Sequence, residues 1–251
     1  MNFLEYKKMY QLEESNWWYT GRRNLIIKTV GKFREESGDK ALQILDAGCG
    51  TGINLGYLNA YGKACGLDIS KEALRFSGIR GSSTLICGSL DKLPLKSKQF
   101  DLVVALDVIE HIQDDQTAVL ELNRILRLGG CLIATVPAFP FLWSNHDIAV
   151  HHKRRYTRSE LCNILCLGGF SIKRATYWNF FLFLPVAAMR IFKRSTTCEE
   201  ENKTDLVYLP SPINQIMLCL LQIENSILER LNLPFGVSVM CVCRKVCEGQ
   251  K

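Results

Sequence analysis

Three glycines follow an aspartate in the segment LDAGCGTG, residues 45–52. The residues before the aspartate are apolar, which is typical of a buried strand that ends in a turn. A loop of small residues lets a ligand approach the backbone closely, and ligands of open α/β sheets bind beyond the carboxyl ends of the strands. This loop is therefore the first candidate for a binding site.

The spacing of the glycines separates two classes of ligand. Loops that bind dinucleotides carry GxGxxG, in which the third glycine lets the following helix pack closely and the helix N-terminus receives a pyrophosphate. Here Ile53 occupies that third position and Gly52 precedes it, so the pattern is GxGxG. Asp46 comes just before the loop, and a carboxylate there favours a ligand with a positive charge over a pyrophosphate.

A second acidic residue lies about 20 residues beyond the loop. Asp68 ends the apolar run in GLDIS, where an acidic side chain accepts hydrogen bonds from ribose hydroxyls. Together with Asp46 and the loop, it indicates a nucleoside with a cationic tail. S-adenosylmethionine fits, because it combines a ribose, an ammonium and a sulfonium group. The alternative is that the glycines form a tight turn without a ligand.

Strands and helices alternate around these residues. We expect strands in ALQILDAG, ACGLDIS, STLICGS, QFDLVVALD, GGCLIATVP, FSIKRATYW and GVSVMCVCRK. Ser70 and Asp114 are placed to cap helices, and Thr157 with Glu160 matches a capping box at the start of another. This alternation predicts an α/β fold with a mostly parallel sheet and helices on both faces.

Four segments resemble the class I S-adenosylmethionine-dependent methyltransferases of the type-11 group. They are LDAGCGTG, GLDIS, LPLKSKQFDLVVALDVIEHI and LRLGGCLIATVP. The resemblance covers roughly residues 40–137 and implies a Rossmann-like sheet of seven strands with an antiparallel last strand. It implies S-adenosyl-L-methionine as cofactor and methyl transfer as activity. NWWYTGRR, HDIAVHHKRRYTRSEL and PFGVSVMCVCRK resemble a narrower subgroup.

The resemblance assigns roles within the cofactor site. The loop backbone would meet the methionine part near Asp46, Asp68 would hold the ribose, and Ile69 would pack on the adenine. Ser89 stands where the family usually has an aspartate for the adenine amino group, and the amide of Leu90 would serve beside it. The full set of expected cofactor contacts is Asp46, Gly48, Cys49, Gly50, Gly52, Asp68, Ile69, Ser89, Leu90, Leu106 and Arg22.

Residues that would act on the acceptor follow the fourth and fifth strands. A hydroxyl or amine acceptor can need a base, and histidine is the natural base near neutral pH. His146 and His152 are the main candidates, with Asp147 as an orienting group, and His111 is a third. The alternative is that these residues brace a lid loop.

The segment DVIEHI, with Asp107, Glu110 and His111, also offers oxygen and nitrogen ligands. Some methyltransferases of quinone biosynthesis bind a divalent metal through a similar E-x-x-E-H, in which Asp107 would replace the first Glu and Asp115 would be the fourth ligand. We expect instead that Glu110 and His111 order the loop and cap the next helix, so no metal is predicted.

Two further groups of residues each allow a structural and a functional interpretation. A basic cluster after the histidines comprises Lys153, Arg154, Arg155 and Arg158. It is either a solvated face or a site for a phosphate or carboxylate of the acceptor. In NWWYTGRR, Arg22 would reach the cofactor carboxylate, or Trp17 and Trp18 would pin a helix to the core.

Residues 178–235 interrupt the alternation. They contain the apolar run Phe180–Met189 between cations, a polar linker KRSTTCEEENKTD and a helix INQIMLCLLQIENSILERL. We predict an N-terminal helical cap over residues 1–38, a cofactor-binding methyltransferase domain over 39–177 and 236–247, and a helical insertion over 178–235. The apolar run is too short to span a bilayer. It would cover the core, form a homodimer interface, or contact a membrane surface through residues 178–194.

Amino-acid composition and net charge limit the classes of binding partner that we expect. The 251 residues are 47% apolar, enough for one sizeable core, and the net charge of +6 is too small to indicate nucleic acid. The first residues do not resemble a secretory signal, so the 11 cysteines indicate reduced thiols. We expect a cytoplasmic protein, with membrane association as an alternative.

The expected activity is methylation of a small-molecule or lipid-linked acceptor, at oxygen because candidate bases lie near its site. A binding protein of the same fold without catalysis is the main alternative. A nicotinamide oxidoreductase is disfavoured by Ile53, and RNA methylation by the modest charge.

Overall fold

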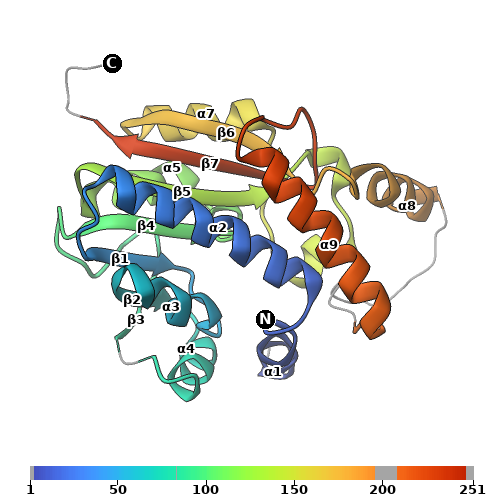
Figure 1. Cartoon of the computed structure of the whole chain (residues 1–251), viewed down its shortest axis with the longest axis horizontal. Coiled ribbons are helices and arrows are strands. Elements are labelled where there is room, and N and C mark those ends of the chain that lie inside the picture. Colours follow the sequence, from blue (N-terminus) through green and yellow to red (C-terminus); the bar gives the residue numbers. More distant parts are fainter. Residues whose placement is uncertain (1–2, 83, 196–207, 247–251) are drawn as a thin grey trace.

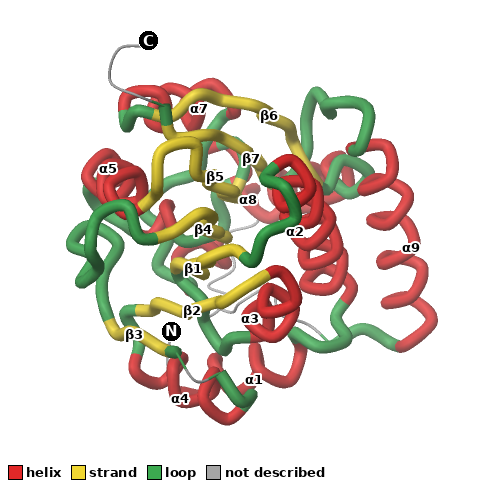
Figure 2. Tube along the Cα trace, turned by 60° about the vertical axis from the view of Figure 1, so that its left-hand side comes forward, coloured by secondary structure: helices red, strands yellow, loops and turns green. Residues whose placement is uncertain are grey.

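The computed structural model describes residues 3–82, 84–195 and 208–246, with the backbone alone for 191–195. A seven-stranded sheet runs through the centre (Figures 1 and 2). Its strands are β1 (Leu42–Ala47), β2 (Gly62–Asp68), β3 (Leu85–Cys87), β4 (Phe100–Leu106), β5 (Leu126–Pro137), β6 (Phe170–Trp178) and β7 (Ser238–Lys245). They coincide with the seven runs that the sequence predicts.

The order across the sheet is β3-β2-β1-β4-β5-β7-β6. β1 pairs parallel with β2 and β4, β2 with β3, and β4 with β5. β7 lies antiparallel between β5 and β6. The predicted Rossmann-like sheet with an antiparallel last strand is therefore confirmed. The chain reverses direction across the sheet between β1 and β4, where ligands of such sheets bind.

Helices cover both faces of the sheet (Figure 2). They are α1 (Phe3–Leu12), α2 (Trp17–Glu36), α3 (Ile53–Leu58), α4 (Lys71–Ile79), α5 (Asp115–Ile125), α6 (Asn145–Ala149), α7 (Arg158–Leu167), α8 (Phe183–Ser195) and α9 (Ser211–Leu228). Short 3-10 turns are η1 (Asn59–Tyr61), η2 (Ile109–His111) and η3 (Pro140–Leu142). On one face α5 and α7 pack on the strands, and on the other α2, α3 and α9 do.

The strands are apolar throughout because both of their faces are buried. In β4, Val103 and Ala105 point into the core beneath α5 and α7, whereas Leu102 and Val104 point toward α2. Such two-sided burial is what a near-continuous apolar strand requires. It fixes the register of β4, and with it the position of the residues that follow its carboxyl end.

The predicted helix starts are confirmed by their caps. Ser70 accepts a hydrogen bond from the backbone amide of Ala73, and Asp114 accepts one from that of Thr117. Thr157 and Glu160 form the capping box of α7. These side chains satisfy amides that have no partner within the helix.

The N-terminal segment forms two helices, and the break between them falls at residues 13–16. α2 lies along the sheet beside α9 (Figure 1). Gly21 permits this close approach, because a Cβ there would lie 2.4 Å from Leu221 Cδ1. Asn225 of α9 also donates to the carbonyl of Gly21, at 2.9 Å. The division of the chain into three parts stays a prediction.

Within the predicted insertion, α8 contacts the turn η3 after β5, and α9 packs against α2. Most of the predicted polar linker, at 196–205, lies outside the described residues. No helix in the described part of the chain has the length and apolar character needed to cross a membrane.

Candidate active site

The glycine loop lies at the carboxyl ends of β1 and β2. The amides of Gly48 and Cys49 both donate to the carbonyl of Leu67, at 2.7 and 2.9 Å. Asp68 accepts from the amides of Gly50 and Ser70, at 2.9 and 2.8 Å. The backbone therefore holds the loop against the end of β2, and it positions the Asp68 carboxylate that the sequence singled out.

The three glycines of the loop all have left-handed φ values, of 80°, 55° and 81°. A Cβ on Gly48 would lie 2.5 Å from Val108, and one on Gly52 would lie 2.1 Å from Ser77 Oγ. Packing against the protein itself therefore explains these two glycines. A Cβ on Gly50 would meet only Met9, at 3.0 Å, so Gly50 is the position where the loop faces α1.

Asp46 is buried directly beneath the loop. It is 1% exposed, and its Oδ2 atom has no hydrogen-bond partner among the described residues. Burial raises the pKa of Asp46 to about 7, and the charges of Asp68 and Glu13 add to this while Arg22 opposes it. A buried carboxyl group with an unpaired oxygen is suited to a cationic ligand group, because that ligand would compensate the cost of ionisation.

The residues expected around the adenine are spread over three strand ends. Ile69 follows β2 and is 70% exposed, so its apolar surface is open to a planar ring. Leu90 is buried, and Ser89 beside it forms a bridge with Lys92. Leu106 is buried at the end of β4. These placements agree with the expected contacts, whose roles stay predictions.

The first helix is fastened over the glycine loop, a feature that sequence reasoning missed. Buried Glu13 accepts a hydrogen bond from the hydroxyl of Thr51. Arg80 donates to the carbonyls of Thr51 and Tyr10, at 3.1 and 2.6 Å, and pairs with Glu13 at 3.5 Å and Glu14 at 2.8 Å. Apart from Thr51, none of these residues belongs to a recognisable motif, so only the folded chain reveals the network.

Arg22 lies between the loop and the segment after β4. Its guanidinium forms an ion pair with Asp107 and lies 4.3 Å from the ring centroid of Trp18. Thr135 donates to the other oxygen of Asp107, at 3.1 Å. Trp17 and Trp18 pack against the core, which confirms that they pin the helix. A contact of Arg22 with the cofactor stays a prediction.

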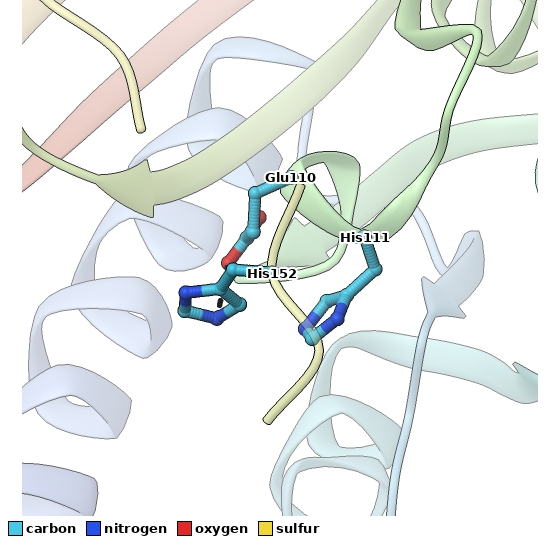
Figure 3. Close-up of side chains that lie close together, drawn as sticks. All are labelled: Glu110, His111 and His152. Carbon is cyan, nitrogen blue, oxygen red and sulfur yellow. Dashed lines mark ion pairs between the residues drawn. The ribbon is translucent and has the colours of Figure 1, made fainter. Parts of the chain in front are cut away.

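Glu110, His111 and His152 converge beside this region (Figure 3). Glu110 and His111 belong to η2 after β4, and His152 belongs to the loop that follows α6. The Nε2 atom of His152 lies 3.7 Å from Glu110 Oε1, and the rings of His111 and His152 are 4.8 Å apart. His146 of α6 is further away, with 6.1 Å between its ring centroid and that of His152.

Asp147 holds His152 in place. The Nδ1 atom of His152 lies 2.8 Å from Asp147 Oδ1, and Arg155 binds both oxygens of the same carboxylate, at 2.7 and 3.0 Å. Burial alone would raise the pKa of Asp147, but His152 and Arg155 hold it well below its usual range. Because the ionised carboxylate can only accept, Nδ1 donates this hydrogen bond, and the Nε2 atom on the other side of the ring faces Glu110.

The other two members of this cluster are also perturbed. Burial and the neighbouring His152 together lower the pKa of His111 to about 4, although a hydrogen bond to the backbone of His151 opposes them. Burial, followed by the charge of Asp107, raises the pKa of Glu110 well above its usual value. Strong shifts from burial and specific charges are typical of functional sites.

One expectation for these segments is wrong: Glu110 and His111 do not cap α5, because Asp114 does. Asp115, the fourth ligand of the alternative metal site, binds Arg154 at 2.9 Å and the hydroxyl of Tyr156 at 2.7 Å instead. In the basic cluster, Lys153 is exposed, whereas Arg155 is 6% exposed and bound to Asp147. Salt bridges, rather than a free anion site, therefore account for Arg154 and Arg155.

Comparison with known proteins agrees with this geometry. Residues 45–134 match the family described as "Methyltransferase domain". A protein of Mycolicibacterium smegmatis named "Probable S-adenosylmethionine-dependent methyltransferase" is 29% identical over 166 residues, which are 64% of this chain and 62% of that protein. A methyltransferase structure from Thermotoga maritima has a TM-score of 0.57 at 19% identity, covering 96% of this chain and 95% of the other.

Other relatives bear more specific names. A "Malonyl-[acyl-carrier protein] O-methyltransferase" of Legionella pneumophila is 33% identical over 124 residues, which are 42% of this chain and 44% of that protein. A human protein named "Probable tRNA methyltransferase 9B" is 32% identical over 145 residues, which are 57% of this chain and 30% of that protein. The chain thus spans less than two thirds of the length of these three curated relatives.

Residues 45–134 therefore match a methyltransferase domain, and the sheet has the Rossmann-like fold of solved S-adenosylmethionine-dependent methyltransferases. The cofactor of this domain is S-adenosylmethionine, as the glycine spacing and the two aspartates predict. The site residues fit this cofactor, because Asp46 offers an unpaired buried oxygen to a cationic group and Ile69 offers an exposed apolar surface.

Proposed function

We propose that the protein methylates an oxygen atom of a small-molecule or lipid-linked acceptor. The observation that carries this proposal is that a predicted cofactor contact and two residues of the cluster lie on one short segment. Leu106 ends β4 at the predicted cofactor site, and Glu110 and His111 follow within η2. Because β4 is rigidly packed on both faces, a cofactor at the strand end and an acceptor at the cluster would meet in a fixed geometry.

The chain's own residues have separate roles in this proposal. Asp46 and the loop backbone hold the methionine part of the cofactor, Asp68 the ribose, and Ile69 the adenine. When bound, S-adenosylmethionine supplies an electrophilic methyl carbon whose bond to sulfur breaks as the acceptor oxygen attacks, leaving the electron pair on sulfur. The cluster with His152 acts on the acceptor hydroxyl, which must lose its proton, and His146 helps to orient the acceptor.

Oxygen is favoured over other acceptor atoms by the cluster, because a hydroxyl needs help in losing its proton at neutral pH. The name of the Legionella relative specifies an O-methyltransferase, whereas the human relative is named for tRNA. The net charge of +6 gives little support for tRNA. A fold relative that binds the cofactor without turnover is the second candidate, and Ser89 in place of the usual acidic residue favours it.

We further propose a cytoplasmic protein that touches membranes through α8. Leu184 and Met189 of this helix are 68% and 46% exposed, and apolar side chains of this kind can enter a membrane interface. Arg190 does not contribute to this surface, because it is 8% exposed and donates to the carbonyl of Leu142. The alternative is that the exposed apolar side chains of α8 form a homodimer interface.

Calorimetric titration with S-adenosylmethionine, its demethylated product and NADH tests the cofactor directly. We expect the first two to bind and NADH to give no heat. Asp68→Ala should weaken binding at least tenfold, because a half-buried carboxylate expected to hold the ribose is lost, while Asp91→Ala at an exposed position should not. Radioactive methyl transfer into lipid extracts, small-molecule extracts and tRNA then identifies the acceptor class. Cofactor binding without transfer into any of these would favour the non-catalytic candidate.

A further inference from the structure

We propose that Glu110, His111 and His152 bind a divalent transition-metal ion. Each side chain offers one ligand atom, and the three atoms all lie within 4.8 Å of one another (Figure 3). The residues come from η2 and from the loop after α6, and the 40 residues 112–151 lie between them in the chain. The amide of Lys153 donates to the carbonyl of Glu110 at 2.8 Å and fastens the two segments at this point.

The burial of Glu110 without hydrogen-bond partners in the described part of the chain indicates a missing positive group. It is fully buried, and neither carboxylate oxygen has a hydrogen-bond partner among the described residues. Burying an unpaired carboxylate is costly, and proteins compensate such groups by pairing them or by metal coordination. Arg22 and Arg155 lie near enough to act on it electrostatically, but each is bound to another carboxylate, Asp107 or Asp147. A divalent cation between Glu110 and the two imidazoles would compensate the charge of the Glu110 carboxylate.

The two histidines are already oriented as metal ligands usually are. Metal-binding histidines typically donate the other ring N–H to a carboxylate or a backbone carbonyl, which fixes the ring and makes the free nitrogen more basic. His152 has Asp147 at 2.8 Å from Nδ1, and Arg155 holds this carboxylate from behind. His111 is hydrogen-bonded to the backbone of His151. Both rings thus have a supporting partner outside the cluster.

The ligand types select the class of metal. Two imidazoles with one carboxylate suit zinc, iron, manganese or cobalt, whereas magnesium and calcium prefer oxygen ligands. Bond lengths of about 2.0–2.1 Å at a tetrahedral ion separate two ligand atoms by about 3.3 Å. The observed 3.7 Å between His152 Nε2 and Glu110 Oε1 is only slightly longer. His111 would have to rotate toward the ion.

Three protein ligands leave at least one coordination position open, as in catalytic sites. We infer that this position takes an oxygen of the acceptor, a step that rests on the proposed function. Coordination would then help the acceptor hydroxyl release its proton to water, so the imidazole nitrogens serve as ligands and not as the proton acceptor. Acceptors with two neighbouring oxygen atoms, such as a catechol or a hydroxy acid, would fit best because they can chelate.

The test is metal titration of the chelator-treated protein by calorimetry and by Co²⁺ visible absorption. We expect Zn²⁺ and Co²⁺ to bind at one ion per chain, with Co²⁺ absorption bands of nitrogen and oxygen ligation, and Mg²⁺ and Ca²⁺ to bind far more weakly. His152→Asn and Glu110→Gln should each weaken binding at least a hundredfold. His151→Asn is the matched control, because His151 is the exposed neighbour of His152 and asparagine tolerates its positive φ of 62°.

Thermal unfolding keeps the test informative if a variant folds poorly. Zn²⁺ should raise the melting temperature of the unaltered protein and of His151→Asn, and it should leave that of Glu110→Gln unchanged. Glu110→Gln should itself be at least as stable as the metal-free protein, because it removes an unpaired buried charge. Equal Zn²⁺ affinity in all variants would overturn the site. So would thiolate charge-transfer bands with Co²⁺, since Cys87, Cys166 and Cys219 are exposed.

The metal-binding proposal and the proposed function can fail independently of each other. S-adenosylmethionine binding is measured on the same metal-free and metal-loaded samples. Cofactor binding without metal binding would reject the metal site and leave the methyltransferase proposal intact. Metal binding without binding of the cofactor would reject the proposed function and leave the metal site standing.

Discussion

At the scale of single residues, the sequence predicts the candidate cofactor contacts from local spacing, whereas it does not predict which residues meet on the acceptor side. Asp46 and Asp68 stand at fixed spacings from the glycine loop, and local spacing is visible in a sequence. The partnership of Glu110 with His152 depends on how two distant loops meet, so no local pattern reveals it. The sequence did suggest Asp147 as an orienting group, and its 2.8 Å contact with His152 agrees.

Asp46 makes cofactor binding dependent on pH. Burial raises the pKa of Asp46 to about 7, and the charged groups that act on it are Asp68 and Glu13, which raise the pKa, and Arg22, which lowers it. A cationic ligand favours the ionised form, so binding below about pH 7 must release a proton. We expect affinity for S-adenosylmethionine to increase about fivefold to tenfold between pH 6 and pH 7.5, measured by calorimetry.

The control is Asp46→Asn, which should bind weakly and with little pH dependence. The same pKa shift also makes the stability of the folded protein depend on pH. Stability falls as pH rises, whereas affinity for the cofactor increases. Because the folded pKa exceeds the unfolded value, the contribution of Asp46 is most favourable below pH 4 and is lost as pH rises to about 7. Asp46→Asn should therefore be the more stable protein at pH 7.5 without ligand. An unchanged pH profile in this variant would rule Asp46 out as the titrating group.

At the scale of elements, the strands and helix caps were predictable because each depends on a local pattern. The runs that became β4 and β7 are mostly apolar, that of β6 is rich in β-branched and aromatic residues, and the caps at Ser70, Asp114 and Thr157 lie at helix starts. The role of η2 was not predictable in the same way. Its residues lack helical or strand periodicity, and their contacts come from the loop after β5.

α9 shows a further limit of local patterns. Its amphipathic sequence predicts a helix, but gives no sign that Glu224 caps a distant loop. Glu224 is fully buried and accepts hydrogen bonds from the amides of Asn179, Phe180 and Phe181, the last two at 2.9 and 3.4 Å. One carboxylate therefore joins α9 to the chain that leads from β6 into α8.

We expect Glu224→Ala to lower the free energy of unfolding by about 2–4 kcal/mol, because one buried and two partly buried amides lose a charged acceptor. Glu224→Gln should have a smaller effect, since its carbonyl oxygen can still accept. Glu229→Ala is a suitable control, because Glu229 is exposed and pairs only with exposed Lys28. Urea unfolding of the three variants measures these differences. Equal stability of Glu224→Ala and Glu229→Ala would show that the loop finds other acceptors.

At the scale of the whole molecule, the additions to the sheet gather at the end where the parallel strands finish. α1 lies over the glycine loop, and α8 contacts η3 after β5 (Figure 1). For an acceptor that approaches the cluster from the side of α8, a membrane surface in contact with this helix would bring lipid-linked acceptors close, whereas a freely diffusing acceptor requires no such contact.

Vesicle flotation distinguishes these two cases. If α8 enters a membrane interface, replacing exposed Leu184 by Glu should lower partitioning into anionic vesicles about tenfold or more, because an apolar side chain is lost and a negative charge is added. Leu167→Glu is the matched control, since Leu167 is equally exposed, at 69%, but lies on α7 at the opposite end of the molecule (Figure 1). Equal loss in both variants would indicate a general charge effect. Absence of binding by the unaltered protein would contradict the membrane contact, and the acceptor would then be sought among small molecules in solution.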